Sequence, residues 1–187
     1  MSEPLLDRDA IILHEMMAHV PLFTHQKPQT IAVINDCNQG IVQEVLKHPT
    51  VKQVWQNNTP TTEPDALDAV IIADRPQDID IDYYFSRLLS EGILIQLSES
   101  PFQLSELKKT QQHLKAVGFA DILPLQFPQP SFKSGWRSAI IAIKEGTIRR
   151  PREKDIFNKS FATHYYNLDV HRAAFALPEF MRLELEV

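Results

Sequence analysis

The stretch from Thr30 to Lys47, TIAVINDCNQGIVQEVLK, most constrains the fold of this chain. Thr30 to Ile34 is a continuous apolar run, which is typical of a parallel strand buried on both faces. Gly40 to His48 has apolar residues at helical spacing, and Pro49 ends that helix because the residue before a proline is disfavoured in the helical region. The stretch therefore predicts a strand, a tight loop and a helix. Nucleotide-binding α/β folds use this unit with a glycine-rich loop, but this loop contains one glycine.

The rest of the chain alternates strand-length apolar runs with amphipathic helical stretches. We expect further strands at 51–56, 67–73, 93–97, 120–125 and 136–144. We expect further helices at 9–19, 83–90, 105–117, 155–160 and 170–175, and a last one from 179. A connector should follow the first helix at Pro21, Gly92 should stop the helix at 83–90, and Gly118 should close the helix at 105–117. This alternation predicts an α/β fold with an open, mostly parallel sheet flanked by helices.

Composition limits the classes of function. With 187 residues the chain is expected to form a single domain, 1–187. The net charge of -5 gives no support for nucleic-acid or membrane-surface binding. No apolar run approaches the ~20 residues of a membrane helix, and the N-terminus lacks a signal-peptide pattern. Cys37, the single cysteine, fits a reducing compartment, so a cytoplasmic location is expected. We predict a buried, inert thiol at this position.

Five short segments carry a family resemblance. They are HEM-x-AHVPL at 14–22, V-x-EVLKHP-x-V at 42–51, Q-x-x-ESPF at 96–102, P-x-x-x-SGWR at 130–137, and YYN with H-x-AAFALP-x-F at 165–180. Together and in this order they resemble the spermidine synthase (polyamine aminopropyltransferase) family. The resemblance covers most of the chain, and its specificity comes from the five segments jointly.

This resemblance implies a Rossmann-like, methyltransferase-type sheet. It also implies transfer of an aminopropyl group from decarboxylated S-adenosylmethionine, a co-substrate rather than a tightly bound cofactor, to putrescine or a related amine. The expected ligands are therefore a polyamine and a nucleoside, and the resemblance is compatible with a homodimer. The family's small N-terminal β domain has no counterpart in the sequence.

The resemblance also assigns roles to single residues. Asp74 aligns with the family's proton acceptor and is the expected catalytic residue. His14, Asp36 and Asp78 are the expected substrate-binding residues, and a carboxylate among them would hold a cationic amine. Because ligands of such sheets bind outside the C-terminal ends of the strands, 35–40 and 74–78 should lie on one rim.

The expected cofactor-binding positions depart from the family pattern. Asn38 stands where the family has an aspartate, and Asn58 where it has a ribose-binding glutamate. Gly40 is the glycine that the loop retains, and it would open the helix N-terminus to the co-substrate. A second acidic position of the family falls on Gln77. Between the second strand and Leu67 the family has another helix and strand, and this connection is too short for them.

Two interpretations stay open at this stage. In the first, the protein is an active aminopropyltransferase with a rebuilt site. In the second, it is a non-catalytic homologue that serves as a binding or partner subunit. Two of the site residues also have a structural alternative: Asp74 as a strand-end turn or cap residue, and His14 as a core or surface histidine. Glu15 is predicted to support packing of the first helix.

Overall fold

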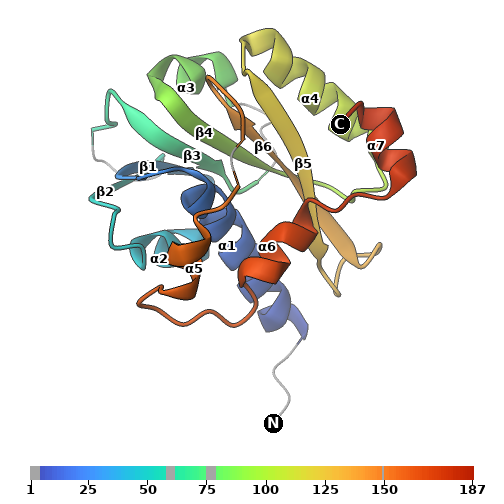
Figure 1. Ribbon diagram of the computed structural model, residues 1–187, viewed down its shortest axis with the longest axis horizontal. Helices are drawn as coiled ribbons and strands as arrows, with labels where there is room; N and C mark the ends of the chain where they lie inside the picture. The colour runs from blue at the N-terminus through green and yellow to red at the C-terminus, as the bar shows by residue number, and fades with distance from the viewer. Residues whose placement is uncertain (1–4, 58–61, 75–78, 149) are drawn as a thin grey trace.

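Six strands form one sheet in the computed structural model, which describes residues 5–57, 62–74, 79–148 and 150–187. The sheet order is β2-β1-β3-β4-β6-β5 (Figure 1). The strands are β1 (Thr30–Ile34), β2 (Gln53–Gln56), β3 (Leu67–Ile72), β4 (Leu88–Ser98), β5 (Asp121–Pro128) and β6 (Trp136–Ile143). β2, β1, β3 and β4 run parallel, whereas β6 is antiparallel to both β4 and β5. The predicted mostly parallel α/β sheet is confirmed.

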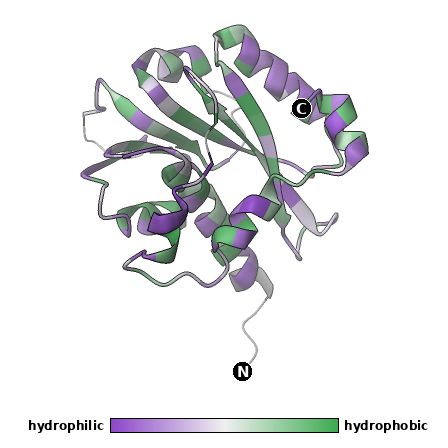
Figure 2. Cartoon of the chain, viewed as in Figure 1, coloured by the Kyte–Doolittle hydropathy of each residue, from purple (hydrophilic) through white to green (hydrophobic). Residues whose placement is uncertain are grey.

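Helices cover both faces of the sheet (Figure 1). One face packs against α1 (Leu5–Thr24), α2 (Gly40–Leu46), α5 (Glu153–Phe157) and α6 (Leu168–Ala174). The other face packs against α3 (Ile81–Arg87), α4 (Leu104–Val117) and α7 (Glu179–Leu185). Hydrophobic residues from the sheet and from the helices on each side form the two core clusters, and Figure 2 colours the chain by hydropathy. All six residues of β3 are buried, as the two-sided packing of a central strand requires.

The first helix is longer than the sequence predicts. α1 continues through Pro21 to Thr24, where a connector was expected. A proline removes one helical hydrogen bond, because it has no N–H. The backbone recovers at once, since His25 N donates to the carbonyl of Pro21 at 2.9 Å. Leu22 and Phe23 are both buried, and the burial of these side chains compensates for the missing bond.

The start of β4 also differs from the prediction. The helix α3 ends at Arg87, and β4 begins at Leu88 and runs through Gly92, which was expected to stop a helix. Long-range pairing decides this segment. Lys144 N donates to the carbonyl of Gly92 at 3.0 Å, and Glu145 N donates to that of Ser90 at 2.9 Å. These bonds come from residues just past the end of β6, so no local pattern could reveal them.

The connection between β2 and β3 carries no extra helix or strand among its described residues, 57 and 62–66. Both strands pair with β1, so β2 is an edge of the sheet. Two contacts hold the connection against α3. Tyr83 donates its hydroxyl hydrogen to Glu63 at 2.7 Å, and Arg87 Nη1 donates to the carbonyl of Pro64 at 3.0 Å. The sheet is therefore shortened on the β2 side, as the length of this connection predicts.

Candidate functional site

The loops after β1 and β3 begin side by side. Ile34 and Ile72, the last residues of these strands, are paired in parallel register. Ala73 N then donates to the carbonyl of Ile34 at 2.9 Å, which holds the start of the second loop against the first. Asp74 follows directly and is exposed. The predicted catalytic carboxylate thus lies at the C-terminal edge of the central strands, where ligands of such sheets bind.

In the loop at 35–40, residues with amide side chains take backbone conformations that glycine usually takes. Asn35 and Gln39 have positive φ angles of 60° and 58°, a conformation that glycine adopts without steric cost. Asparagine is among the residues that tolerate it best. Asn57, at the end of β2, accepts from Asn35 N at 3.1 Å and donates its amide to Asn35 Oδ1 at 2.9 Å. Sequence reasoning did not single out Asn57, although its position one residue after a predicted strand was a usable signal.

The Asp36 carboxylate lies inside the loop. The residue is buried, and its Oδ2 accepts from Val42 N at 2.9 Å. Its carbonyl accepts from Gln39 N at 3.2 Å. These bonds fix the first turn of α2, as a capping aspartate does. The structure therefore gives Asp36 a loop-holding contact at the rim, at a position predicted to bind substrate.

His14 covers the start of α2. A Cβ atom added to Gly40 would lie 2.0 Å from His14 Cε1, so the imidazole fills the space above this glycine. Burial lowers the pKa of His14, while the charges of Asp36 and Glu44 and a hydrogen bond with Asn38 oppose that shift. His14 is accordingly neutral at pH 7. The glycine that was expected to open the helix to a co-substrate is in contact with a histidine.

The remaining predicted positions divide into three groups. Asn38 is exposed, and its Oδ1 accepts from Gly40 N at 3.2 Å. Asp78 and Asn58 lie outside the described residues. The prediction of a buried Cys37 is wrong: the thiol is exposed, because the loop turns outward between Asp36 and the helix.

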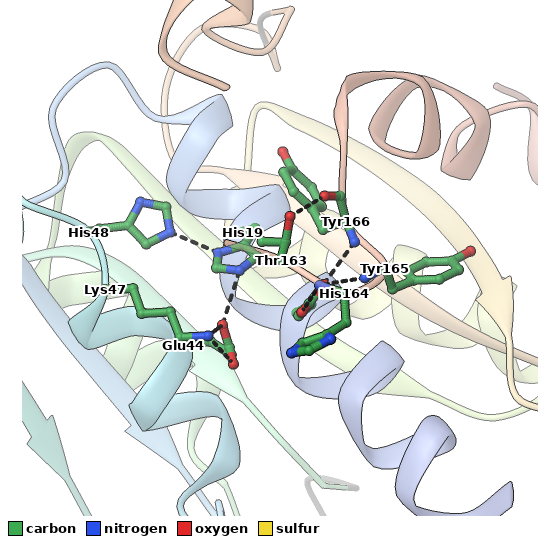
Figure 3. Close-up of polar contacts among 9 residues, drawn as sticks. His19, Glu44, Lys47, His48, Thr163, His164, Tyr165 and Tyr166 are labelled. Atoms are coloured by element: carbon green, nitrogen blue, oxygen red, sulfur yellow. Dashed lines mark hydrogen bonds and ion pairs between the residues drawn. The ribbon is translucent and has the colours of Figure 1, made fainter. Parts of the chain in front are cut away.

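Glu15 organises the C-terminal segment beside this site. Its side chain is 1% exposed, and it accepts three backbone N–H groups, from His164 at 2.7 Å, Tyr165 at 2.9 Å and Tyr166 at 2.7 Å. Figure 3 shows His164, Tyr165 and Tyr166 beside a second cluster of polar side chains, that of His19, Glu44, Lys47 and His48. The predicted supporting role of Glu15 takes the form of a bond between α1 and a segment about 150 residues away.

The described residues lack the features of two other classes of protein. Across residues 5–57, 62–74, 79–148 and 150–187, no group of three or more histidine, cysteine or acidic side chains is arranged to hold a metal ion. In the same part of the chain, no helix is both long and apolar enough to cross a membrane.

The strand order and the rim place the protein in a class. A mostly parallel sheet that ends in an antiparallel β6–β5 pair, with candidate ligand residues after β1 and β3, defines a methyltransferase-type α/β fold. Two solved structures share it. A spermidine synthase from Thermotoga maritima aligns with a TM-score of 0.82 and 23% identity, over 96% of this chain and 76% of that one. A spermidine synthase in complex with the transition state analogue AdoDATO aligns with a TM-score of 0.80 and 22% identity, over 94% and 75%.

Sequence comparison gives the family. Residues 10–57 match the spermine/spermidine synthase domain. The polyamine aminopropyltransferase of Thioalkalivibrio sulfidiphilus is 34% identical over 97% of this chain and 80% of its own length. That of Methylococcus capsulatus is 35% identical over 93% and 76%. The chain belongs to the polyamine aminopropyltransferase (spermidine synthase) family.

Proposed function

We propose that this protein is an aminopropyltransferase that acts on decarboxylated S-adenosylmethionine and on putrescine or a related amine. The observation that carries the proposal is Asp74, an exposed carboxylate directly after β3, within a chain that aligns over 97% of its length with an enzyme of this name. The co-substrate would bind and leave in each cycle, so no tightly bound cofactor is required.

The proposed reaction balances with one base. The neutral amine nitrogen attacks the carbon next to the sulfonium, and the new N–C bond forms as the C–S bond breaks. The sulfur keeps the electron pair and becomes a neutral thioether. The nitrogen gains the positive charge and loses a proton to Asp74, which acts as a general base. The positive charge of the sulfonium passes to the nitrogen and leaves it with the proton. One proton is released in each cycle, so a single carboxylate can accept it.

The other rim residues supply positioning in this proposal. His14 is neutral, so one of its ring nitrogens can accept a hydrogen bond from an ammonium group. Asp36 stays buried under the loop and contributes its negative charge from there. Asn38 offers an amide where a carboxylate would bind a cation more strongly, because charge-assisted hydrogen bonds are worth about 1.5–3 kcal/mol each. We therefore expect weaker co-substrate binding than a loop with an aspartate at this position would give. Gly40, Asn58 and Asp78 keep their predicted binding roles as part of the proposal.

Product formation tests the proposal. The purified protein is incubated with decarboxylated S-adenosylmethionine and putrescine, and spermidine is measured by mass spectrometry. We expect turnover, and we expect Asp74→Asn to lower kcat by about 10²–10⁴, the usual contribution of a general base. Asp82→Asn, an exposed aspartate of α3, is the matched control and should keep full turnover.

Calorimetric titration with the co-substrate separates the two interpretations. No turnover and no heat from a folded protein would refute the transferase and leave the non-catalytic subunit. Turnover that survives Asp74→Asn would keep the transferase and remove the role of Asp74.

We place the reaction in the cytoplasm, in line with the single cysteine. A homodimer stays a prediction, which light scattering on the purified chain can check.

A further inference from the structure

A second pocket lies away from the Asp74 rim. It has a volume of about 280 Å³ and is formed by the ends of α1 and α2 and by the segment at 152–161. α1 runs from His14 at the rim to Phe23 at the pocket, a rise of about 13 Å for nine residues of helix. α2 likewise begins at the rim, and His48, just past its end, lines the pocket. The proposed transferase reaction does not use this space.

Three rings form the inner wall of the pocket. Phe23 and His48 are buried, and Phe161 is half-buried. The ring centroid of His48 lies 4.8 Å from that of Phe23 and 5.1 Å from that of Phe161. Such a wall offers aromatic faces and edges at the spacing at which aromatic rings attract one another. A flat aromatic ligand fits this surface.

A chain of polar contacts leads from the surface to His48 (Figure 3). Lys47 Nζ lies 2.7 Å from Glu44 Oε2. The same oxygen lies 3.2 Å from His19 Nε2, a charge contact rather than a well-formed hydrogen bond. His19 Nδ1 and His48 Nε2 are hydrogen-bonded at 2.9 Å. His19 is fully buried, so water cannot take the place of these contacts.

This series of polar contacts determines which ring nitrogens of His19 and His48 carry hydrogen. Burial raises the pKa of Glu44, but His19 and Lys47 outweigh it and leave the pKa lowered, so the carboxylate is ionised. His19 must therefore present an N–H from Nε2 to Glu44, and its Nδ1 is left as an acceptor. His48 then donates from Nε2. Burial, together with His19 and Arg152, lowers the pKa of His48 to about 3, so this ring is neutral and its Nδ1 is an acceptor.

Two polar groups at the pocket lack a partner. No donor among the described residues pairs with His48 Nδ1. Thr50 also lines the pocket, and its Oγ1 is buried without a hydrogen-bond partner in the described structure. His48 is neutral, so its Nδ1 can accept a hydrogen bond from an occupant of the pocket.

The charges at the pocket favour an anion. Arg152 is committed to structure: it pairs with Asp155 and donates to the carbonyls of Leu22 and His25 at 2.9 and 2.8 Å. Lys159 makes no hydrogen bond or ion pair with another described residue. The pocket therefore keeps one uncompensated positive charge.

We propose that this pocket binds a small planar aromatic acid that carries an O–H or N–H donor. The ring packs against Phe23 and Phe161, the donor pairs with His48 Nδ1, and the acid group pairs with Lys159. A volume of about 280 Å³ is close to the lower end of the range for ligand pockets, which suits a molecule with one or two rings. The site is separate from the transferase rim.

Titration of the full-length protein with 4-hydroxybenzoate tests the proposal, with ¹⁵N-labelled histidine observed by NMR. Before addition, His48 should show hydrogen on Nε2 and none on Nδ1. On addition, the Nδ1 signal should shift. Benzoate, which lacks the donor, and phenol, which lacks the acid, should each bind about 10-fold more weakly, the loss of roughly one hydrogen bond or ion pair. No shift of His48 at millimolar 4-hydroxybenzoate, or equal binding of all three probes, overturns the proposal.

Two variants locate the binding. Lys159→Ala and Phe161→Leu should each weaken 4-hydroxybenzoate at least fivefold, and they leave the His19–His48 bond in place. Lys154→Ala is the matched control, because Lys154 is an exposed lysine of the neighbouring α5 that does not line the pocket. Asp74→Asn should bind the probe as the parent protein does. Equal weakening by Lys154→Ala and Lys159→Ala would mean nonspecific attraction and would overturn the assignment.

Discussion

Single side chains hold the loop after β1 in the shape that glycines would otherwise provide. Asp36 fixes the first turn of α2 through Val42 N, and Asn57 locks Asn35 from the neighbouring strand. His14 fills the space above Gly40. Each of these contacts restricts the conformation of the loop, either by a hydrogen bond or by close packing. The rim residues contact one another, so a substitution at one of them should alter the position of the side chain next to it.

The contact between His14 and Gly40 predicts an effect that changes sign. An alanine is worth about 0.5–1 kcal/mol over glycine in a helix. In the parent protein, however, the new Cβ would lie 2.0 Å from the His14 ring and must expel it. We expect Gly40→Ala to lower the free energy of unfolding by about 1–2 kcal/mol in the parent, and to raise it by about 0.5–1 kcal/mol in a His14→Ala background.

Urea denaturation of the four proteins in this cycle measures the coupling. The His14→Ala background is itself the control, because it removes the clash and keeps the helix start. The same destabilisation in both backgrounds would mean that His14 does not occupy the space above Gly40.

Among the elements, α1 has the most connections. It packs on the sheet through Met16 and Met17, which are fully buried, and it contacts α2 and α5. It also carries Glu15, which accepts three backbone N–H groups of the segment between α5 and α6. This helix therefore joins the rim, the His48 pocket and the segment that precedes α6.

Removal of the Glu15 carboxylate should release the segment at 164–166 from α1. Glu15→Ala leaves three N–H groups without their charged acceptor, and we expect a loss of about 3–5 kcal/mol in the free energy of unfolding. Glu15→Gln keeps one acceptor oxygen and should cost less. Glu145→Ala, an exposed glutamate, should stay within about 0.5 kcal/mol. Hydrogen exchange should show faster exchange at residues 164–166 in Glu15→Ala; unchanged protection there would contradict this account.

For the whole molecule, the buried histidines set how stability depends on pH. Burial lowers the pKa of His48 to about 3, and burial with a contribution from Arg172 lowers that of His171 to about 4. Burial also lowers the pKa of His19. These residues connect α1, α2 and α6 across one face of the sheet. Their protonation is therefore coupled to unfolding of the whole domain.

The sign follows from proton binding. Unfolded histidines take up a proton below about pH 6.5, whereas folded His48 and His171 take one up only near 3 and 4. Their stabilising contribution is thus present above pH 6.5 and is lost as the pH falls toward the folded values. For these two groups we expect a loss of about 2 kcal/mol between pH 6 and pH 5, at 1.36 kcal/mol per proton and pH unit.

Urea midpoints at pH 7, 6 and 5 measure this loss. His48→Gln should make the drop smaller by about 1 kcal/mol, the share of one histidine, whatever its effect on the absolute stability. His113→Gln is the control, because solvent hydrates this exposed ring in both states, and the drop should stay as in the parent. A stability that does not change between pH 7 and pH 5 would contradict the buried, neutral state of these histidines.

The sequence by itself determined the elements whose own residues carry the signal. The apolar run of β1 matches its prediction residue for residue, and Gly118 closes α4 with a φ of 119°. Local backbone preferences and hydrophobic periodicity act within a few residues, so they can be read in order. The family likewise follows from the sequence, because five segments keep its pattern.

Only the tertiary structure decided the features that depend on partners far along the chain. α1 passes through Pro21 because Leu22 and Phe23 are buried by other elements. β4 begins early because Lys144 and Glu145, just past the end of β6, bond to it. The same holds at the two sites: His14 lies over Gly40, and His19 links His48 to Glu44. Burial and charge pairing between distant residues have no local period, so the fold alone sets them.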